Sequence, residues 1–197
     1  MQVSEKISKH ERVKGYVGWK INFLHDRSDT GPGRGIMANL RRGVGKSPGE
    51  IPELWGMIFD KMPEELLGKS KASPAEWAVY TALTLYALHQ QGNENFMNVE
   101  DVSVGKAASI LAKNEDDEDR IRRRLGLVVT ATSPFDLAYH LRGVIQLLSR
   151  DAIGLDYARL ARELYLMNNE ERAKDIKLSW GREFYIHKKA EDENAEQ

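Results

Sequence analysis

Apolar residues along this chain recur at intervals of three and four, which is the spacing of one face of an α-helix. The clearest example is residues 73–92. Its helical positions are occupied by Trp77, Tyr80, Leu83, Thr84, Ala87 and Leu88. Ser73 and Glu76 match a capping box, and Gly92 is suited to a left-handed helix stop. Further apolar residues on the other faces predict that this helix lies at the centre of a bundle.

The rest of the ordered sequence also has helical spacing. Ser133 and Asp136, with a proline between them, repeat the start signal and predict a helix through about Arg150. Asp156 and Asn169 are suitable N-caps for two more helices. Less regular helices are expected near 11–26, 35–43, 51–61 and 100–113. No run shows the period-two alternation of a strand, so the pattern predicts an all-α protein.

Two segments do not fit this helical pattern. Residues 28–35, SDTGPGRG, are rich in glycine and polar groups, so we expect them to be loose. The acidic tail 190–197 has no apolar anchor, and we expect it to fray.

Length and composition exclude several classes of protein. The 197 residues are enough for one sizeable core, or for two small ones that share an interface. No stretch approaches the roughly 20 apolar residues of a membrane span, and the N-terminus has no apolar segment typical of a secretory signal. The absence of cysteine excludes disulfides, thiolate zinc sites and a cysteine nucleophile. A reducing cytoplasm is therefore the simplest location.

The formal net charge of −1 conceals two basic regions. Residues 1–50 hold ten Lys or Arg against five Asp or Glu, and residues 120–150 hold six arginines against one acid. Such segregation is compatible with a protein that binds a polyanion on one side and protein partners on another. The alternative is that folding mixes the basic regions with acidic ones.

The run RIRRR at 120–124 is the strongest charge feature, and it follows the acidic run 115–119. Helical spacing places Ile121, Leu125 and Val128 on the inner face. Arg120, Arg123 and Arg124 then share the outer face, where like charges four residues apart repel. Arg122 leaves on the opposite flank and is the best candidate for an intramolecular ion pair.

Closely spaced guanidinium groups match a phosphate backbone, so we interpret the outer arginines as a polyanion-binding surface. Arg142, at the edge of the buried face of the next helix, extends that surface if the two helices pack antiparallel. The alternative interpretation is a solvated face with weak surface ion pairs.

Other motifs carry little chemistry. GVGKS at 43–47 resembles the end of a phosphate-binding loop, but Leu40 stands where that motif needs glycine, and no strand precedes it. The hypothesis of a nucleotide-hydrolysing enzyme is supported by this motif alone. The histidines show no metal-binding spacing, and we expect His89 to be satisfied near a helix end. We therefore expect no catalytic site, metal or cofactor.

In several ordered blocks the chain resembles the CasB family, the small subunit of the type I-E CRISPR interference complex Cascade. The blocks are NLRRGVG (39–45), WAVYTALTLYALHQQ (77–91), VGKAASILA (104–112), RIRRRLGLVVTATSPFDLAYHLRGVIQLL (120–148), LDYARLARELYLM (155–167) and WGREFY (180–185). Their order and spacing cover most of the chain from about residue 36 to 185.

This resemblance implies two packed helical bundles in one compact protein, which we place at about 10–95 and 100–189. It implies a non-catalytic subunit present as two adjacent copies in a crRNA-containing surveillance complex that acts in CRISPR antiviral defence. The implied partners are crRNA, either strand of the target DNA, other Cascade subunits and a second copy of the chain, with no membrane. Its basic surface would hold the nucleic acids of the R-loop, including the displaced non-target strand, without reading sequence.

The resemblance also implies binding residues. By position they are Arg41, Arg42, Lys106, Arg123, Arg124 and Arg142. Lys106 stands where relatives often have arginine, while Lys46 and Arg120 are added from local charge. A scaffold whose basic face binds acidic protein neighbours is the alternative function. We further expect Trp77, Tyr80 and Trp180 to serve the core rather than to stack on bases.

Overall fold

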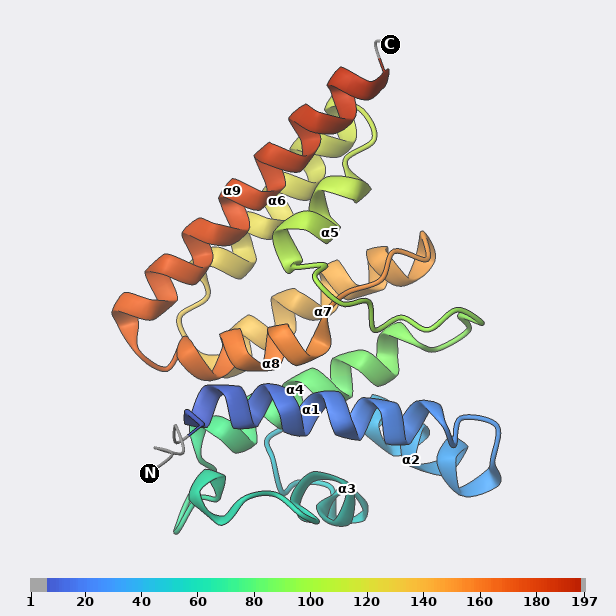
Figure 1. Ribbon diagram of the computed structural model, residues 1–197, viewed down its shortest axis with the longest axis vertical. Helices are drawn as coiled ribbons and strands as arrows, with labels where there is room; N and C mark the ends of the chain where they lie inside the picture. The colour runs from blue at the N-terminus through green and yellow to red at the C-terminus, as the bar shows by residue number, and fades with distance from the viewer. Residues whose placement is uncertain (1–6, 196–197) are drawn as a thin grey trace, which may run out of the picture.

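The computed structural model of the protein describes residues 7–195, with side chains described as far as His187. Within that part the chain forms nine α-helices and two short 3-10 helices and no strand beyond an isolated bridge between Asn98 and Leu155 (Figure 1). The elements are α1 (Lys9–His25), α2 (Gly31–Arg42), η1 (Pro52–Leu54), α3 (Trp55–Phe59), η2 (Glu64–Leu66), α4 (Pro74–His89), α5 (Val104–Leu111), α6 (Glu115–Thr130), α7 (Pro134–Arg150), α8 (Tyr157–Leu166) and α9 (Glu170–Ala195). The predicted all-α class is confirmed.

The predicted N-caps start the long helices. The Ser73 hydroxyl accepts a hydrogen bond from the Glu76 backbone N–H, and the Glu76 carboxylate accepts one from the Ser73 backbone N–H. Ser133, Asp156 and Asn169 likewise accept backbone hydrogen bonds at the starts of α7, α8 and α9. These bonds satisfy donors that a helix N-terminus otherwise leaves unpaired, so they fix where each helix begins.

The helices pack as two bundles. In Figure 1, α1 to α4 form the lower bundle, α5, α6 and α9 form the upper one, and α7 and α8 lie between them. Helix α8 packs on α1 and α4, although it belongs to the C-terminal half of the sequence. The buried side chains form one continuous cluster that runs from Val13 to Phe184. The boundary between 95 and 100 stays a prediction.

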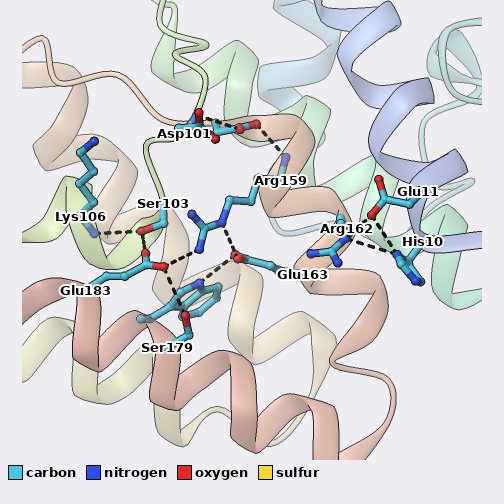
Figure 2. A network of polar contacts seen from close by, with 12 residues as sticks. His10, Glu11, Asp101, Ser103, Lys106, Arg159, Arg162, Glu163, Ser179 and Glu183 are labelled. Atoms are coloured by element: carbon cyan, nitrogen blue, oxygen red, sulfur yellow. Dashed lines mark hydrogen bonds and ion pairs between the residues drawn. The ribbon is translucent and has the colours of Figure 1, made fainter.

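A network of charged side chains joins α8 to both bundles (Figure 2). On one side, Arg159 donates to Glu163 at 2.8 Å and to Glu183 of α9 at 2.6 Å. On the other side, Arg162 donates to Glu11 of α1 at 2.6 Å. Because Glu163 is buried, its charge depends on Arg159 and on the Trp180 indole, which donates to it at 2.8 Å.

The prediction of a loose segment at 28–35 is wrong. Thr30 caps α2 by accepting a hydrogen bond from the Gly33 N–H at 3.0 Å, and proline follows in the first turn. Gly33 is buried so closely that a Cβ would lie 1.9 Å from the Arg27 carbonyl oxygen. Here glycine permits close approach of two backbone segments, and its abundance does not indicate disorder.

Two helix ends also differ from the sequence pattern. Helix α4 ends at His89, and Gly92 takes its positive φ in the turn that follows. The backbone of the acidic tail, expected to fray, is helical as far as Ala195. Its side chains from residue 188 onward lie outside the described residues. Within the described part of the chain, no helix combines the length and apolar character needed to cross a membrane.

Candidate nucleic-acid interface

The arginine-bearing helix α6 is fixed at both ends. Asn114 caps its N-terminus by accepting from the Asp117 N–H at 2.9 Å, and four acids occupy its first turn, where the helix dipole favours negative charge. Near its C-terminus, Lys177 of α9 donates to the Ala131 carbonyl at 3.3 Å. The apolar face of α6 is buried as predicted, through Ile121, Leu125 and Val128.

Two of the four arginines already have acidic partners. Arg122 pairs with Asp119 at 2.5 Å, which confirms its predicted intramolecular ion pair. Arg120, which we expected to face phosphate, pairs with Asp117 at 2.6 Å and is partly buried. The acid three residues earlier therefore offsets the charge of each, and Arg120 is not the open cation that the helical pattern indicated.

Arg123 and Arg124 are exposed, and neither forms an ion pair with any side chain that the structure describes. The Arg124 guanidinium reaches α7, where its Nη1 lies 3.2 Å from the position that a Cβ at Gly143 would occupy. Arg142, next to Gly143, is exposed as well. The predicted extension of the basic surface from α6 onto α7 thus has a direct structural basis.

The packing of α6 and α7 explains this proximity. The two helices contact each other and are joined by the short turn at 131–133. Arg124 lies nine residues before Ser133, and Gly143 lies ten residues after it. Nearly equal distances from the turn place these residues at the same level of an antiparallel helix pair.

The second predicted basic group lies elsewhere. Arg41 and Arg42 end α2, with Arg41 partly buried and the Arg42 guanidinium donating to Asn39 at 3.1 Å. Lys46 is exposed in the loop that follows. These residues belong to the lower bundle, whereas α6 belongs to the upper one (Figure 1). The described structure does not bring the two groups together.

The fold also excludes a phosphate-binding loop at 43–47. The segment follows the C-terminus of α2, whose dipole disfavours anions, whereas such a loop precedes a helix N-terminus. Gly43 instead lies against α4: the Tyr80 hydroxyl donates to its carbonyl at 3.0 Å and would lie 2.7 Å from a Cβ there. This contact anchors the end of α2 to α4.

Lys106 lies in the first turn of α5 and is partly buried. Its backbone N–H donates to the Ser103 hydroxyl at 3.0 Å, and that hydroxyl donates to Glu183. In Figure 2 the Lys106 side chain points away from this network. The network therefore holds the start of α5, and the Lys106 ammonium is directed elsewhere.

Comparison with known proteins identifies the family. The model of the CRISPR-associated protein Cse2 family matches residues 36–185, the range covered by the ordered sequence blocks. The chain belongs to this family. The predicted resemblance to CasB, the small subunit of type I-E Cascade, is therefore confirmed, and family membership supports a role as a Cascade subunit. Comparison with curated protein sequences gave no significant match.

Solved structures agree with this assignment. The crystal structure of CasB from Thermobifida fusca is 33% identical, covers 89% of this chain and 98% of its own, and has a TM-score of 0.76. CasB from M. ruber is 22% identical, with 98% and 100% covered and a TM-score of 0.69. CasB from Thermus thermophilus is 21% identical, with 91% and 99% covered and a TM-score of 0.66. The last two show the fold alone.

In this Cse2-family chain, the sequence pattern missed two exposed rings beside Arg142. Phe135 and Tyr139 on α7 are 52% and 62% exposed, whereas the expectation of a core role covered only Trp77, Tyr80 and Trp180. Tyr80 and Trp180 have that core role, and Trp77 is partly buried. The helical spacing could have predicted the exposure of the two rings, since positions 135, 139 and 142 lie opposite the buried leucines of α7.

Histidine and acid placement supplies no further site. His89 is fully buried, and its Nδ1 lies 2.9 Å from the Tyr157 hydroxyl. Burial lowers the pKa of His89 to about 4, so the ring is neutral at pH 7. Among the described residues, no group of three His, Asp or Glu side chains is arranged to hold a metal ion.

Proposed function

We propose that this protein is a non-catalytic Cascade subunit that binds nucleic-acid backbone without sequence specificity and stabilises the R-loop, including the displaced non-target strand. One observation carries the proposal: Arg123, Arg124 and Arg142 are exposed, without ion-pair partners among the described residues, on one antiparallel helix pair. Arg41, Arg42, Lys46, Lys106 and Arg120 are secondary contacts in this proposal.

The chemistry of these groups supports backbone binding. A guanidinium group offers a planar fork of donors that matches two phosphate oxygens, and phosphate contacts carry no sequence information directly. R-loop formation exchanges one duplex for another of similar stability, so a few backbone contacts can shift the balance. Arginines that hold phosphates would therefore favour the opened target whatever its sequence.

The proposed partners follow from this role. They are crRNA, either strand of the target DNA, other Cascade subunits and a second copy of the chain, in the cytoplasm. No metal, cofactor or catalytic residue takes part in the proposed activity, because the work consists of binding and electrostatic stabilisation.

A scaffold function is the second candidate, and a different surface favours it. Leu178, Tyr185 and Ile186 of α9 are 52%, 52% and 65% exposed and line an apolar groove beside Val129 of α6. Exposed apolar side chains that cluster in this way are typical of protein-protein contacts. In this alternative, the arginines of α6 would bind acidic groups on neighbouring subunits.

A double substitution separates the two functions. Arg123→Ala with Arg124→Ala should leave the composition of the assembled complex unchanged, by native mass spectrometry, and weaken its binding to target DNA. The matched control, Arg27→Ala with Arg172→Ala, removes two exposed arginines that lie outside α6, α7 and the α9 groove, and it should leave DNA binding near the parent value. If the first variant instead drops out of the complex, and the free parent chain never binds single-stranded DNA, the scaffold function is correct.

A further inference from the structure

The exposed rings of α7 form an ordered pair. Phe135 and Tyr139 are four residues apart, so they lie on successive turns of the same helix face. The opposite face, through Leu137, Leu141 and Leu148, is buried in the core. The rings are therefore presented to solvent on a helix whose position the core fixes.

Two arginines flank the rings. Gly143 follows Tyr139 by four residues and lies on nearly the same line of the helix, and the Arg124 guanidinium is located at Gly143. Arg142 follows Tyr139 by three residues and is exposed on the other side of that line. Each ring therefore lies within one or two helical turns of a positive charge that no described acid neutralises.

We propose that Phe135 and Tyr139 are a stacking platform for unpaired bases, so that this surface selects single-stranded nucleic acid over duplex. The proposal rests on the proposed function and names the form of nucleic acid that it binds. Aromatic side chains stack on exposed base faces, and arginines hold the phosphates of the same strand. In a duplex those base faces are covered by neighbouring base pairs.

The spacing of the rings favours an extended strand. Four residues of helix separate the two rings by about 6 Å along the axis. Bases stacked in a duplex strand are about 3.4 Å apart, which is too close for one base on each ring. A strand whose bases are unstacked and spread out can place one base on Phe135 and the next on Tyr139.

A protein partner fits this surface less well than it fits the groove on α9. A protein that covered the rings would also remove water from Arg124 and Arg142, and it would have to supply an acid for each. Of the cations that line the α9 groove, Lys174 already pairs with Glu171 and Lys177 donates to the Ala131 carbonyl. A partner can therefore cover the apolar side chains of that groove and supply fewer acids. In nucleic acid, each repeating unit supplies both a base that can stack on a ring and a phosphate that can pair with an arginine.

Binding to an abasic strand tests the proposal, because that strand keeps the phosphates and lacks the bases. The probes are a fluorescein-labelled single strand and an abasic strand of the same length, titrated with the full-length chain and followed by fluorescence anisotropy. We expect the parent chain to bind the normal strand at least about ten-fold more tightly than the abasic one. Phe135→Leu with Tyr139→Leu should bring that ratio close to one and leave the affinity for the abasic strand unchanged.

Other variants distinguish the possible failures. Arg123→Ala with Arg124→Ala should weaken binding to both strands and preserve their ratio, and Trp19→Leu, an exposed ring on α1, should change neither. Equal binding of the two strands by the parent chain, or an unchanged ratio in the leucine variant, overturns the stacking platform alone. Arginine variants that bind both strands as the parent does overturn the proposed function itself. Circular dichroism and the two single leucine variants, each expected to lower the ratio in part, separate lost stacking from lost folding.

Discussion

The Arg124 guanidinium lies over Gly143, with its Nη1 3.2 Å from the position of a Cβ at residue 143. Gly143 occupies the interior of α7, where glycine is less favourable than alanine by about 1 kcal/mol. The missing side chain leaves room for the cation of one helix to lie on the surface of the next.

Substitution of Gly143 should separate helix stability from binding. Gly143→Ala should raise the free energy of unfolding by up to about 1 kcal/mol, because the flexible end of Arg124 can shift by a few tenths of an ångström. Gly143→Leu should push the guanidinium aside and weaken single-stranded DNA binding by up to about five-fold. Urea denaturation and anisotropy titrations measure the two effects. Unchanged binding in the leucine variant would show that the location of Arg124 at α7 has no role in binding.

Gly105 should tolerate no side chain. A Cβ at this position would lie 2.1 Å from the Trp180 carbonyl oxygen, so α5 and α9 would have to move apart. Gly105→Ala should lower the free energy of unfolding by about 1–3 kcal/mol, as is typical of overpacking. Gly126→Ala is the matched control in α6, since nothing lies within 4 Å of its Cβ position, and it should be stabilising. A stable Gly105→Ala variant would contradict the close α5–α9 contact.

Glu163 should be the most sensitive member of the network around α8. Its side chain is 7% exposed and accepts from both Arg159 and Trp180. Glu163→Ala leaves a partly buried guanidinium with one partner fewer and an indole N–H with none, so it should cost about 3 kcal/mol of stability. Glu171→Ala, which removes an exposed pair with Lys174, should change stability by less than about 0.5 kcal/mol. Equal urea midpoints for the two variants would contradict this account of the network.

His89 should make stability depend on pH. Its pKa is lowered by burial from the usual 6.5 to about 4, so the unfolded chain binds more protons than the folded one between these values. The free energy of unfolding is highest with respect to this group above pH 6.5. It falls as pH drops from 6.5 toward 4, by about 3 kcal/mol in total. Denaturation of the parent and of His89→Gln across this window measures it. Parallel curves for the two proteins would show that His89 is not the responsible group.

The sequence predicted the helices because their signals are local. The caps at Ser73, Ser133 and Asp156 and the inner face of α6 depend on residues three or four apart, and all are confirmed. The high glycine content of 28–35 led to the wrong prediction of a loose segment, since the role of Gly33 depends on a close contact with the Arg27 backbone. Composition cannot distinguish a glycine that permits flexibility from one that permits close approach.

The candidate site was predicted less completely, because its geometry depends on choices that helical periodicity leaves open. The helical spacing of α6 predicted which face of the helix each arginine occupies, but it did not show that Asp117 pairs with Arg120. Likewise, the helical spacing was not used to place Phe135, whose position opposite the core of α7 leaves it exposed. The bundles expected at about 10–95 and 100–189 already separate the Arg41–Arg42 pair from α6, and the packing of the helices keeps the two apart.

The salt dependence of target binding tests the central claim most directly. The measurement is the slope of log affinity against log salt concentration for the assembled complex. It is made with the parent subunit, with Arg123→Ala and Arg124→Ala together, and with Arg27→Ala and Arg172→Ala together as the control. If the α6 arginines each hold a phosphate, the first variant should bind more weakly and lose between about 1 and 2 from the magnitude of the slope, while the control keeps the parent slope. An intact complex with unchanged affinity and an unchanged slope in the first variant would contradict the assignment of Arg123 and Arg124 as backbone-binding residues.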